Sequence, residues 1–242
     1  MTWFLALPLV HAAPPDLAAQ WASVQPEIAK RTPVPVPLSA DDLARLSKGE
    51  SVASRFDTDR GAYATAAIWV DAPIDQVWLV VNDGEHEPAD RSTVRVLDAP
   101  PGIRRVHITL SLPWPIADRQ WVSDIVPSRS LFDATGGRVW QRTWDLQDPA
   151  LATAPAKAVW LKENRGAWTL VDVGQGTLML FTVRTVLGGM LPASITQGWA
   201  VRRLRTQFEE TEARALGMAQ HYDRRHFVVK SPAGKEIPRF PR

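Results

Sequence analysis

The stretch SLPWPIADRQW, residues 111–121, places two prolines and two tryptophans around an Asp-Arg pair. It continues a segment, residues 105–112, in which apolar and polar residues alternate. Alternation with a period of two is typical of an antiparallel strand whose two faces differ. Proline cannot donate a ladder hydrogen bond, so Pro113 and Pro115 are expected to end this strand and to force a corner before the next one.

Further strands are expected on both sides of this corner. Strand-like segments lie at residues 62–70, 105–112, 121–126, 138–146, 168–173 and 177–186, with glycine-containing turns at 133–137 and 174–176. Helices are expected at residues 71–83, with Pro73 in the first turn, and at residues 192–216. The second helix would be roughly 37 Å long. Strands grouped apart from helices predict an α+β fold in which a curled antiparallel sheet is covered by the last helix.

The composition is that of an ordinary globular protein with one sizeable core. The chain has 242 residues, of which 45% are hydrophobic and 22% charged, so a single main domain is expected. The net charge is only +2 and no continuous basic stripe is present, which argues against nucleic acid as a partner. Cysteine is absent, which excludes disulfides and thiolate metal sites.

The N-terminal residues indicate export. An apolar run at residues 3–10 is followed by Val10-His11-Ala12, a small-residue cleavage pattern, so we expect a signal peptide at residues 1–12 and a periplasmic or secreted protein. The alternatives are a start codon inside a longer signal, or an apolar tail on a cytoplasmic protein. No later stretch reaches the ~18 consecutive apolar residues of a membrane span.

Four segments are expected along the chain. Residues 13–38 would form an N-terminal helix and a proline-rich spacer, and Pro26 should end or kink the helix. The apolar positions of this helix are Leu17, Trp21, Val24 and Ile28. The main domain is expected at residues 39–218, with Ser39 as a helix N-cap. Residues 219–242 would be a loosely ordered basic tail.

Residues with catalytic spacing are few. The GxSxG and HExxH patterns are absent, and the glycines at 174–176 lie between two strands and lack the third glycine of a dinucleotide loop. His86, Glu87 and His107 are residue types found in two-His-one-carboxylate sites, but their spacing does not require a metal. We therefore expect no metal and no cofactor.

Tryptophan is unusually abundant, with eleven residues against two tyrosines. Those from residue 114 onward are Trp114, Trp121, Trp140, Trp144, Trp160, Trp168 and Trp199. Any single tryptophan is expected to be core packing. Several that converge on a concave sheet under a helix would instead line an apolar cavity.

Three segments in this order resemble the START domain family of lipid-transfer modules, in the helix-grip or Bet v 1-like superfamily. Residues 72–90, APIDQVWLVVNDGEHEPAD, resemble the family's first strand-to-helix passage. Residues 112–122, LPWPIADRQWV, resemble its Pro-Trp-Pro and Asp-Arg-aromatic motif. Residues 164–209 resemble its Gly-x-Trp strand, hairpin, Gly-Gly-x-x-Pro step and C-terminal helix. The likeness covers residues 41–216.

Two features depart from the family pattern. Residues 84–91 stand where family members usually carry an aromatic-Pro-aromatic sequence, and the helix and spacer before Ser39 are additional. The resemblance implies a curved antiparallel sheet that grips the long C-terminal helix, with a tunnel for one lipid between them. The ligand-binding residues expected from this arrangement are Trp114, Arg119, Trp121, Trp160, Trp168, Phe181 and Trp199. Arg119 would meet a polar ligand group or be satisfied by Asp118.

The first functional hypothesis is a non-enzymatic binder or carrier of one hydrophobic ligand. An alternative is an enzyme of the polyketide cyclase or aromatase type, whose acid or base would be His107, Asp124 or Asp145. Another is a ligand-dependent sensor or adaptor. Fold alone does not choose between them.

The expected partners are a lipid or other hydrophobic small molecule and, transiently, a membrane surface. Gly188 and Gly189 would form a hinge for the long helix. The arginines expected against lipid head groups are Arg202, Arg203 and Arg205. The protein is expected to be a monomer.

Overall fold

The computed structural model describes residues 16–32, 37–58, 61–82, 92–112, 114, 116–152, 157–188, 208–217 and 229–237. The predictions outside these residues concern the signal peptide at 1–12, the 84–91 loop with His86 and Glu87, Pro113 and Pro115, Gly189, Trp199, and the arginines at 202, 203 and 205.

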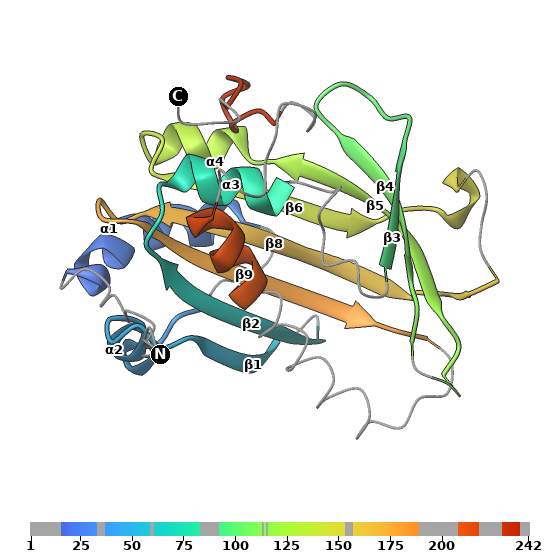
Figure 1. Ribbon diagram of the computed structural model, residues 1–242, viewed down its shortest axis with the longest axis horizontal. Coiled ribbons are helices and arrows are strands. Elements are labelled where there is room, and N and C mark those ends of the chain that lie inside the picture. The colour runs from blue at the N-terminus through green and yellow to red at the C-terminus, as the bar shows by residue number, and fades with distance from the viewer. Residues whose placement is uncertain are drawn as a thin grey trace, which may run out of the picture.

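The described residues form a nine-stranded sheet that is antiparallel except at β7 (Figure 1). The strands are β1 (Val52–Thr58), β2 (Gly61–Val70), β3 (Ser92–Leu97), β4 (Arg104–Leu110), β5 (Arg119–Pro127), β6 (Val139–Leu146), β7 (Val159–Trp160), β8 (Glu163–Asp172) and β9 (Thr177–Val186). Their order across the sheet is β1-β2-β9-β8-β6-β5-β4-β3, and β7 pairs with β5. The second strand along the chain, β2, thus pairs with β9, the last of the nine strands.

Helices cover two different faces of this sheet (Figure 1). They are α1 (Leu17–Arg31), α2 (Ala40–Leu46), α3 (Ile74–Asn82) and α4 (Arg129–Ala134), with a 3-10 turn at Pro149–Leu151 and a helical segment at residues 208–216. We call the face under α3 and residues 208–216 the inner face, and the face under α1 and α2 the outer face. Of the long helix expected at residues 192–216, only this last part lies within the described residues.

The inner face carries one hydrophobic core. Strand residues that alternate along β2, such as Ile68 and Val70, pack there with Leu170 and Met179 and with the apolar side of α3. Phe208 and Ala215 of the C-terminal helix belong to the same cluster. Alternation in the sequence therefore supplies one apolar set of side chains to each face of the sheet.

The outer face carries a second core, to which α1 contributes. Its apolar positions Leu17, Trp21, Val24 and Ile28 are all buried, together with side chains of α2 and the sheet such as Leu178 and Leu180. Pro26 does not end this helix, because α1 continues to Arg31. A proline removes one intrahelical hydrogen bond, and burial of Val24 and Ile28 on either side offsets that loss.

The capping expected before α2 is confirmed. The backbone nitrogen of Asp42 donates to the hydroxyl oxygen of Ser39 at 3.1 Å, and the Ser39 nitrogen donates to the Asp42 carboxylate at 3.0 Å. This reciprocal pair satisfies two donors at the start of α2 and fixes where the helix begins.

Part of the C-terminal tail, expected to be loosely ordered, packs into the inner core. Residues 229–237 turn back on themselves through a bridge between Lys230 and Glu236, and Val229 and Ile237 are buried. The indole nitrogen of Trp78 on α3 donates to the Lys230 oxygen at 2.9 Å. Burial of these two apolar side chains stabilises the packing of this segment against the core. The basic composition of the tail did not predict this packing.

Most expected strands are confirmed, with bounds that agree to within a few residues. The sequence did not predict β1, β3 or β7. The side chains of β1 and β3 are largely exposed and lack a continuous apolar set, and β7 has only two residues. Strand β8 begins at Glu163, five residues before the expected segment at 168–173. Its polar first residues, Glu163 to Arg165, hide the strand pattern.

Candidate functional site

Part of the inner face consists of apolar side chains that no core cluster of the described residues includes. Cross-strand pairing puts Val106 of β4 opposite Ser123 of β5 and Ile108 opposite Trp121, while Ile125 of β5 stands opposite Trp144 of β6. Residues paired in this way point to the same face. We call the following five side chains the apolar floor: Val106, Ile108, Leu110, Trp121 and Ile125. Of these five residues, Trp121 was predicted from the sequence to bind the ligand.

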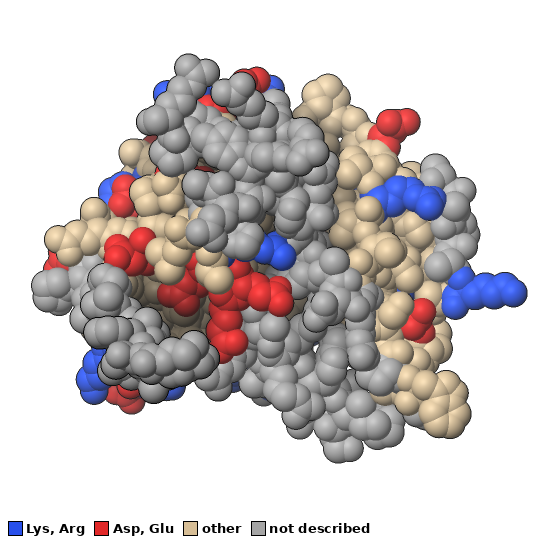
Figure 2. All heavy atoms as spheres, viewed as in Figure 1, with Lys and Arg blue, Asp and Glu red and all other residues tan. Residues whose placement is uncertain are grey.

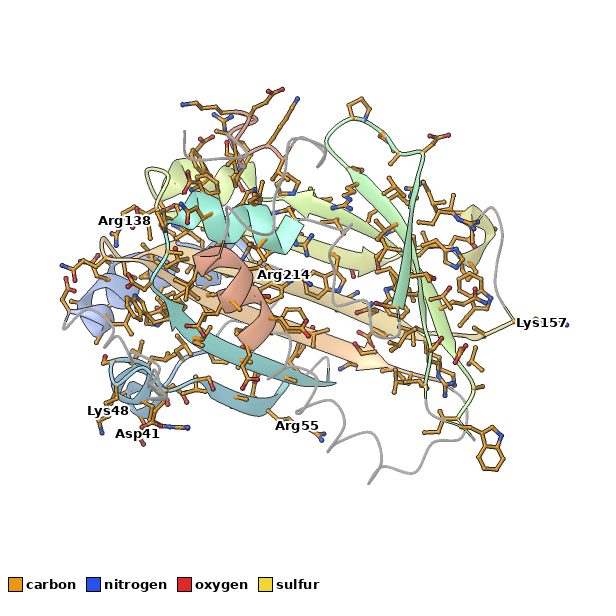
Figure 3. The ribbon with its side chains drawn as sticks, in the orientation of Figure 1. Asp41, Lys48, Arg55, Arg138, Lys157 and Arg214 are labelled. Carbon is orange, nitrogen blue, oxygen red and sulfur yellow. The ribbon has the colours of Figure 1, made fainter. Side chains whose placement is uncertain are left out.

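The apolar floor lies on the half of the sheet formed by β3, β4 and β5, whose side chains are drawn in Figure 3. Val106, Leu110 and Ile125 are buried. The described core of the inner face is instead built on β2, β9, β8 and α3. The floor thus offers an apolar surface that the described helices do not use for their own packing.

A cluster of aromatic rings lies between the apolar floor and the half of the sheet that the helices cover. The ring centroid of Trp168 lies 4.7 Å from that of Phe181 and 5.5 Å from that of Phe208. Trp144, beside the floor, stacks on Phe181 at 5.4 Å. The structure therefore brings two predicted site residues, Trp168 and Phe181, together on the inner face. Phe208 joins them from the C-terminal helix, whose Arg214 is labelled in Figure 3.

Arg142 and Ser123 are buried polar side chains on this same face, where pairing with Leu110 also places the buried Arg119. Arg142 of β6 is 5% exposed and is the register partner of Trp168. Ser123 of β5 is 2% exposed, and its hydroxyl has no hydrogen-bond partner among the described residues. Both were missed by the sequence reasoning. The available signal was the series Trp140, Arg142, Trp144, in which an arginine takes an inward position between two aromatic residues.

Arg119 has a structural role, with partners that the sequence did not predict. Its guanidinium donates to the backbone oxygen of Leu187 at 2.9 Å and to that of Gly188 at 3.1 Å, and it also contacts the Ala117 oxygen. The expectation that a ligand or the Asp118 carboxylate must satisfy this arginine is therefore wrong, because backbone carbonyls do so. Arg119 joins the start of β5 to the chain just after β9.

Asp118 stabilises the turn before β5. Its carboxylate accepts from the Leu112 backbone nitrogen at 3.0 Å and from the Ser111 hydroxyl at 3.3 Å. These contacts bridge the corner that the proline motif predicted.

Two predicted site tryptophans lie away from the inner face. Trp160 pairs with Gln120 in the parallel β7 contact and stacks on His107 with ring centroids 5.8 Å apart, on the outer face. Trp114 is 93% exposed at the corner between β4 and β5. Neither side chain contributes to the apolar floor, although both belong to tryptophan-rich stretches.

The acid-base candidates named from the sequence also lie on the outer face. The Nε2 atom of His107 is 3.2 Å from the Gln120 side-chain oxygen. Asp124 accepts two hydrogen bonds from Arg105, at 2.6 and 2.8 Å, and this pairing raises the pKa of the Arg105 guanidinium. Asp145 pairs with Arg165 at 3.2 Å. These groups point away from the side where the floor lies.

The described residues hold no group of three or more His, Cys, Asp or Glu side chains suited to a metal ion. Acidic side chains do gather around the helix of residues 208–216, on the face drawn in Figure 2. Burial raises the pKa of the Glu212 carboxyl, and the charge of Glu209 raises it further. This helix thus places carboxylates beside the inner core.

No protein-family model matches the chain, and no curated protein matches it. Solved structures with a similar fold include the STAR-related lipid transfer protein of Xanthomonas axonopodis (TM-score 0.57, 16% identity, 68% of this chain and 93% of that chain). They also include human StAR-related lipid transfer protein 5 (TM-score 0.59, 13% identity, 84% and 97%) and human STARD10 (TM-score 0.57, 12% identity, 80% and 85%). The likeness confirms the predicted α+β helix-grip fold.

Proposed function

We propose that this chain, which has the fold of the START-type lipid-transfer structures, binds one lipid on the apolar floor and carries it. The observation that carries the proposal is the floor itself, whose five apolar side chains face inward and belong to no described core cluster. Each buried methylene of a ligand contributes about 0.8 kcal/mol. A long acyl chain on this surface would therefore bind without many polar contacts.

The named activity of the similar structures supports the same proposal. The Xanthomonas axonopodis protein and human StAR-related lipid transfer protein 5 are both described as lipid transfer proteins. Their likeness to this chain is one of fold, so ligand and activity are extended to it here as a proposal.

The placement of the acid-base candidates favours a carrier over an enzyme. A general acid or base must lie within hydrogen-bond reach of the reacting group. His107, Asp124 and Asp145 occupy the outer face, and two of them are engaged in ion pairs with Arg105 and Arg165. A sensor or adaptor would share the binding step and differ only in what binding causes.

The proposed carrier is exported through residues 1–12, acts as a monomer and contacts membranes transiently. None of the described helices has the length and apolar character needed to cross a membrane. A carrier of this kind would release its ligand where the membrane surface competes with the floor for the acyl chain. Arg202, Arg203 and Arg205 stay predicted contacts for anionic head groups.

Native mass spectrometry of the purified protein, followed by solvent extraction, tests the proposal. One co-purifying lipid per chain is the expected result. A matched pair of variants locates the site, because Ile108 and Thr109 are neighbours that face opposite sides of β4. Ile108→Glu should abolish lipid binding and Thr109→Glu should preserve it. An empty protein that binds no added lipid, or that converts an added polyketide, would refute the carrier.

A further inference from the structure

A buried hydroxyl stands among the side chains of the apolar floor. Residues 106–110 and 121–125 present the following side chains to the inner face: Val106, Ile108, Leu110, Trp121, Ser123 and Ile125. Ser123 is the polar member of this set. It is 2% exposed, and its hydroxyl has no hydrogen-bond partner among the described residues. A hydroxyl buried without a partner costs free energy, which points to a partner that a bound molecule supplies.

The register of the sheet gives Ser123 apolar neighbours. It stands opposite Val106 of β4 and Leu146 of β6, and Trp121 and Ile125 flank it on the same face of β5. Paired side chains have Cβ atoms about 4.5–5.5 Å apart. A ligand chain that lies on the apolar floor therefore passes directly over this hydroxyl.

The two buried arginines of the inner face are distant from Ser123 along the sheet. Arg119 precedes it on β5 by four residues, roughly 13 Å of strand, and donates to backbone oxygens just after β9. Arg142 pairs with Pro127, which follows Ser123 by the same spacing. Neither arginine is therefore a sheet neighbour of the hydroxyl.

A third arginine, Arg104, stands opposite Ile125 on β4. Its guanidinium donates to the backbone oxygen of Asn82 at 2.7 Å, at the end of α3. An ionised group over Ser123 would lose its hydration shell and gain only a neutral hydroxyl and apolar side chains as sheet neighbours. An uncharged oxygen has less hydration to lose, so this position favours neutral chemistry.

We infer that Ser123 hydrogen-bonds an uncharged oxygen, a hydroxyl or an ester carbonyl, of a lipid whose chain lies on the apolar floor. This inference rests on the proposed function and adds to it the chemical class of the ligand. A serine hydroxyl donates to a carbonyl, and it both donates to and accepts from another hydroxyl. The pairing satisfies the buried hydroxyl and fixes how far along the floor the oxygen of the lipid lies.

Four probes with eighteen-carbon chains test the inference: oleyl alcohol, methyl oleate, oleate and 1-octadecene, which carries no oxygen. Each probe is delivered from methyl-β-cyclodextrin in equilibrium dialysis, and its affinity is expressed as a ratio to that of 1-octadecene. For at least one neutral probe this ratio should be about five- to tenfold lower in Ser123→Ala than in the wild type, the factor expected for one neutral hydrogen bond. Loss for the alcohol indicates a lipid hydroxyl, and loss for the methyl ester indicates an acyl ester.

Ser54→Ala is the matched control, because it makes the same change at an exposed position of β1. It should keep all the wild-type ratios. Unchanged ratios for both neutral probes in Ser123→Ala, or a larger loss for oleate than for either of them, would overturn the inference while the carrier function stands. Failure of every probe to bind, 1-octadecene included, would instead count against the carrier function.

A second variant covers the case in which Ser123→Ala does not fold. Ser123→Cys keeps a side chain of similar shape but replaces the hydroxyl by a weak donor and acceptor. The chain has no other cysteine, so the new thiol cannot form an intramolecular disulfide. The ratio for the favoured neutral probe should fall in this variant as well. A wild-type ratio in Ser123→Cys would refute the assignment.

Discussion

The indole ring of Trp144 lies directly over Gly166, its register partner on β8. A Cβ atom on residue 166 would stand 2.2 Å from Cζ2 of Trp144 and 2.5 Å from the backbone oxygen of Thr182. The Trp144 indole nitrogen donates to the Asn164 side-chain oxygen at 3.1 Å, which holds the ring in this position. The glycine of the Gly-x-Trp pattern therefore makes room for an aromatic ring at the edge of the apolar floor.

Gly166→Ala should destabilise the protein by about 1–3 kcal/mol, because the added methyl group overpacks this contact. For a chain of this size the melting temperature should fall by roughly 2–4 °C per kcal/mol. Differential scanning calorimetry measures the change. The double variant Gly166→Ala/Trp144→Leu should recover part of the loss, because the smaller leucine side chain relieves the contact with the ring. The recovery should be incomplete, because the added methyl group still contacts the Thr182 oxygen. An unchanged melting temperature in the single variant would contradict the packing described.

Arg119→Leu should lower the free energy of unfolding by about 3 kcal/mol, because hydrogen bonds from a charged group to the Leu187 and Gly188 carbonyls are lost. Ligand affinity of the folded variant should stay close to that of the wild type. Urea unfolding and a lipid-binding titration measure the two quantities. Asp118→Asn should have a smaller effect, since that carboxylate contacts Leu112 and Ser111. Weakened binding with unchanged stability would restore Arg119 as a ligand contact.

Ser123→Ala should raise the stability of the ligand-free protein by about 1 kcal/mol, since a buried hydroxyl without a partner is costly. Chemical unfolding of delipidated protein tests this expectation. Ser54→Ala, at an exposed position of β1, should change little. If Ser123 also contacts a polar group of the bound lipid, its variant should release that lipid faster. A destabilised ligand-free variant would show that the hydroxyl is satisfied within the protein.

Glu212→Gln should raise the free energy of unfolding at pH 7. Burial and Glu209 raise the pKa of this carboxyl in the folded protein. The folded state then binds more protons than the unfolded state, so stability falls as pH rises from the unfolded pKa of about 4.3 through the raised folded value. The gain in the variant should be largest at pH 7 and vanish near pH 4. Asp98→Asn, at an exposed carboxyl, is the control for the removal of one negative charge.

Period-two alternation predicts which residues of one strand share a face, and this much followed from the sequence. Trp140, Arg142 and Trp144 lie on one side of β6 because successive side chains point to opposite faces. The same rule placed Trp168 with Leu170 on β8. The Pro-Trp-Pro stretch predicted a corner because proline cannot donate a ladder hydrogen bond. The order of strands and helices along the chain was sufficient to predict the α+β fold class.

Tertiary structure alone decided which of the two sides became the inner face and what each polar side chain meets. Trp121 and Asp124 are three residues apart, and only pairing with β4 and β6 sets the first inward and the second toward Arg105. A single-residue change of register would exchange them. The carbonyls that occupy Arg119 belong to residues 68 and 69 positions further along the chain. Local sequence carries no information about partners so distant, which is why these carbonyls could not be predicted as the partners of the motif arginine.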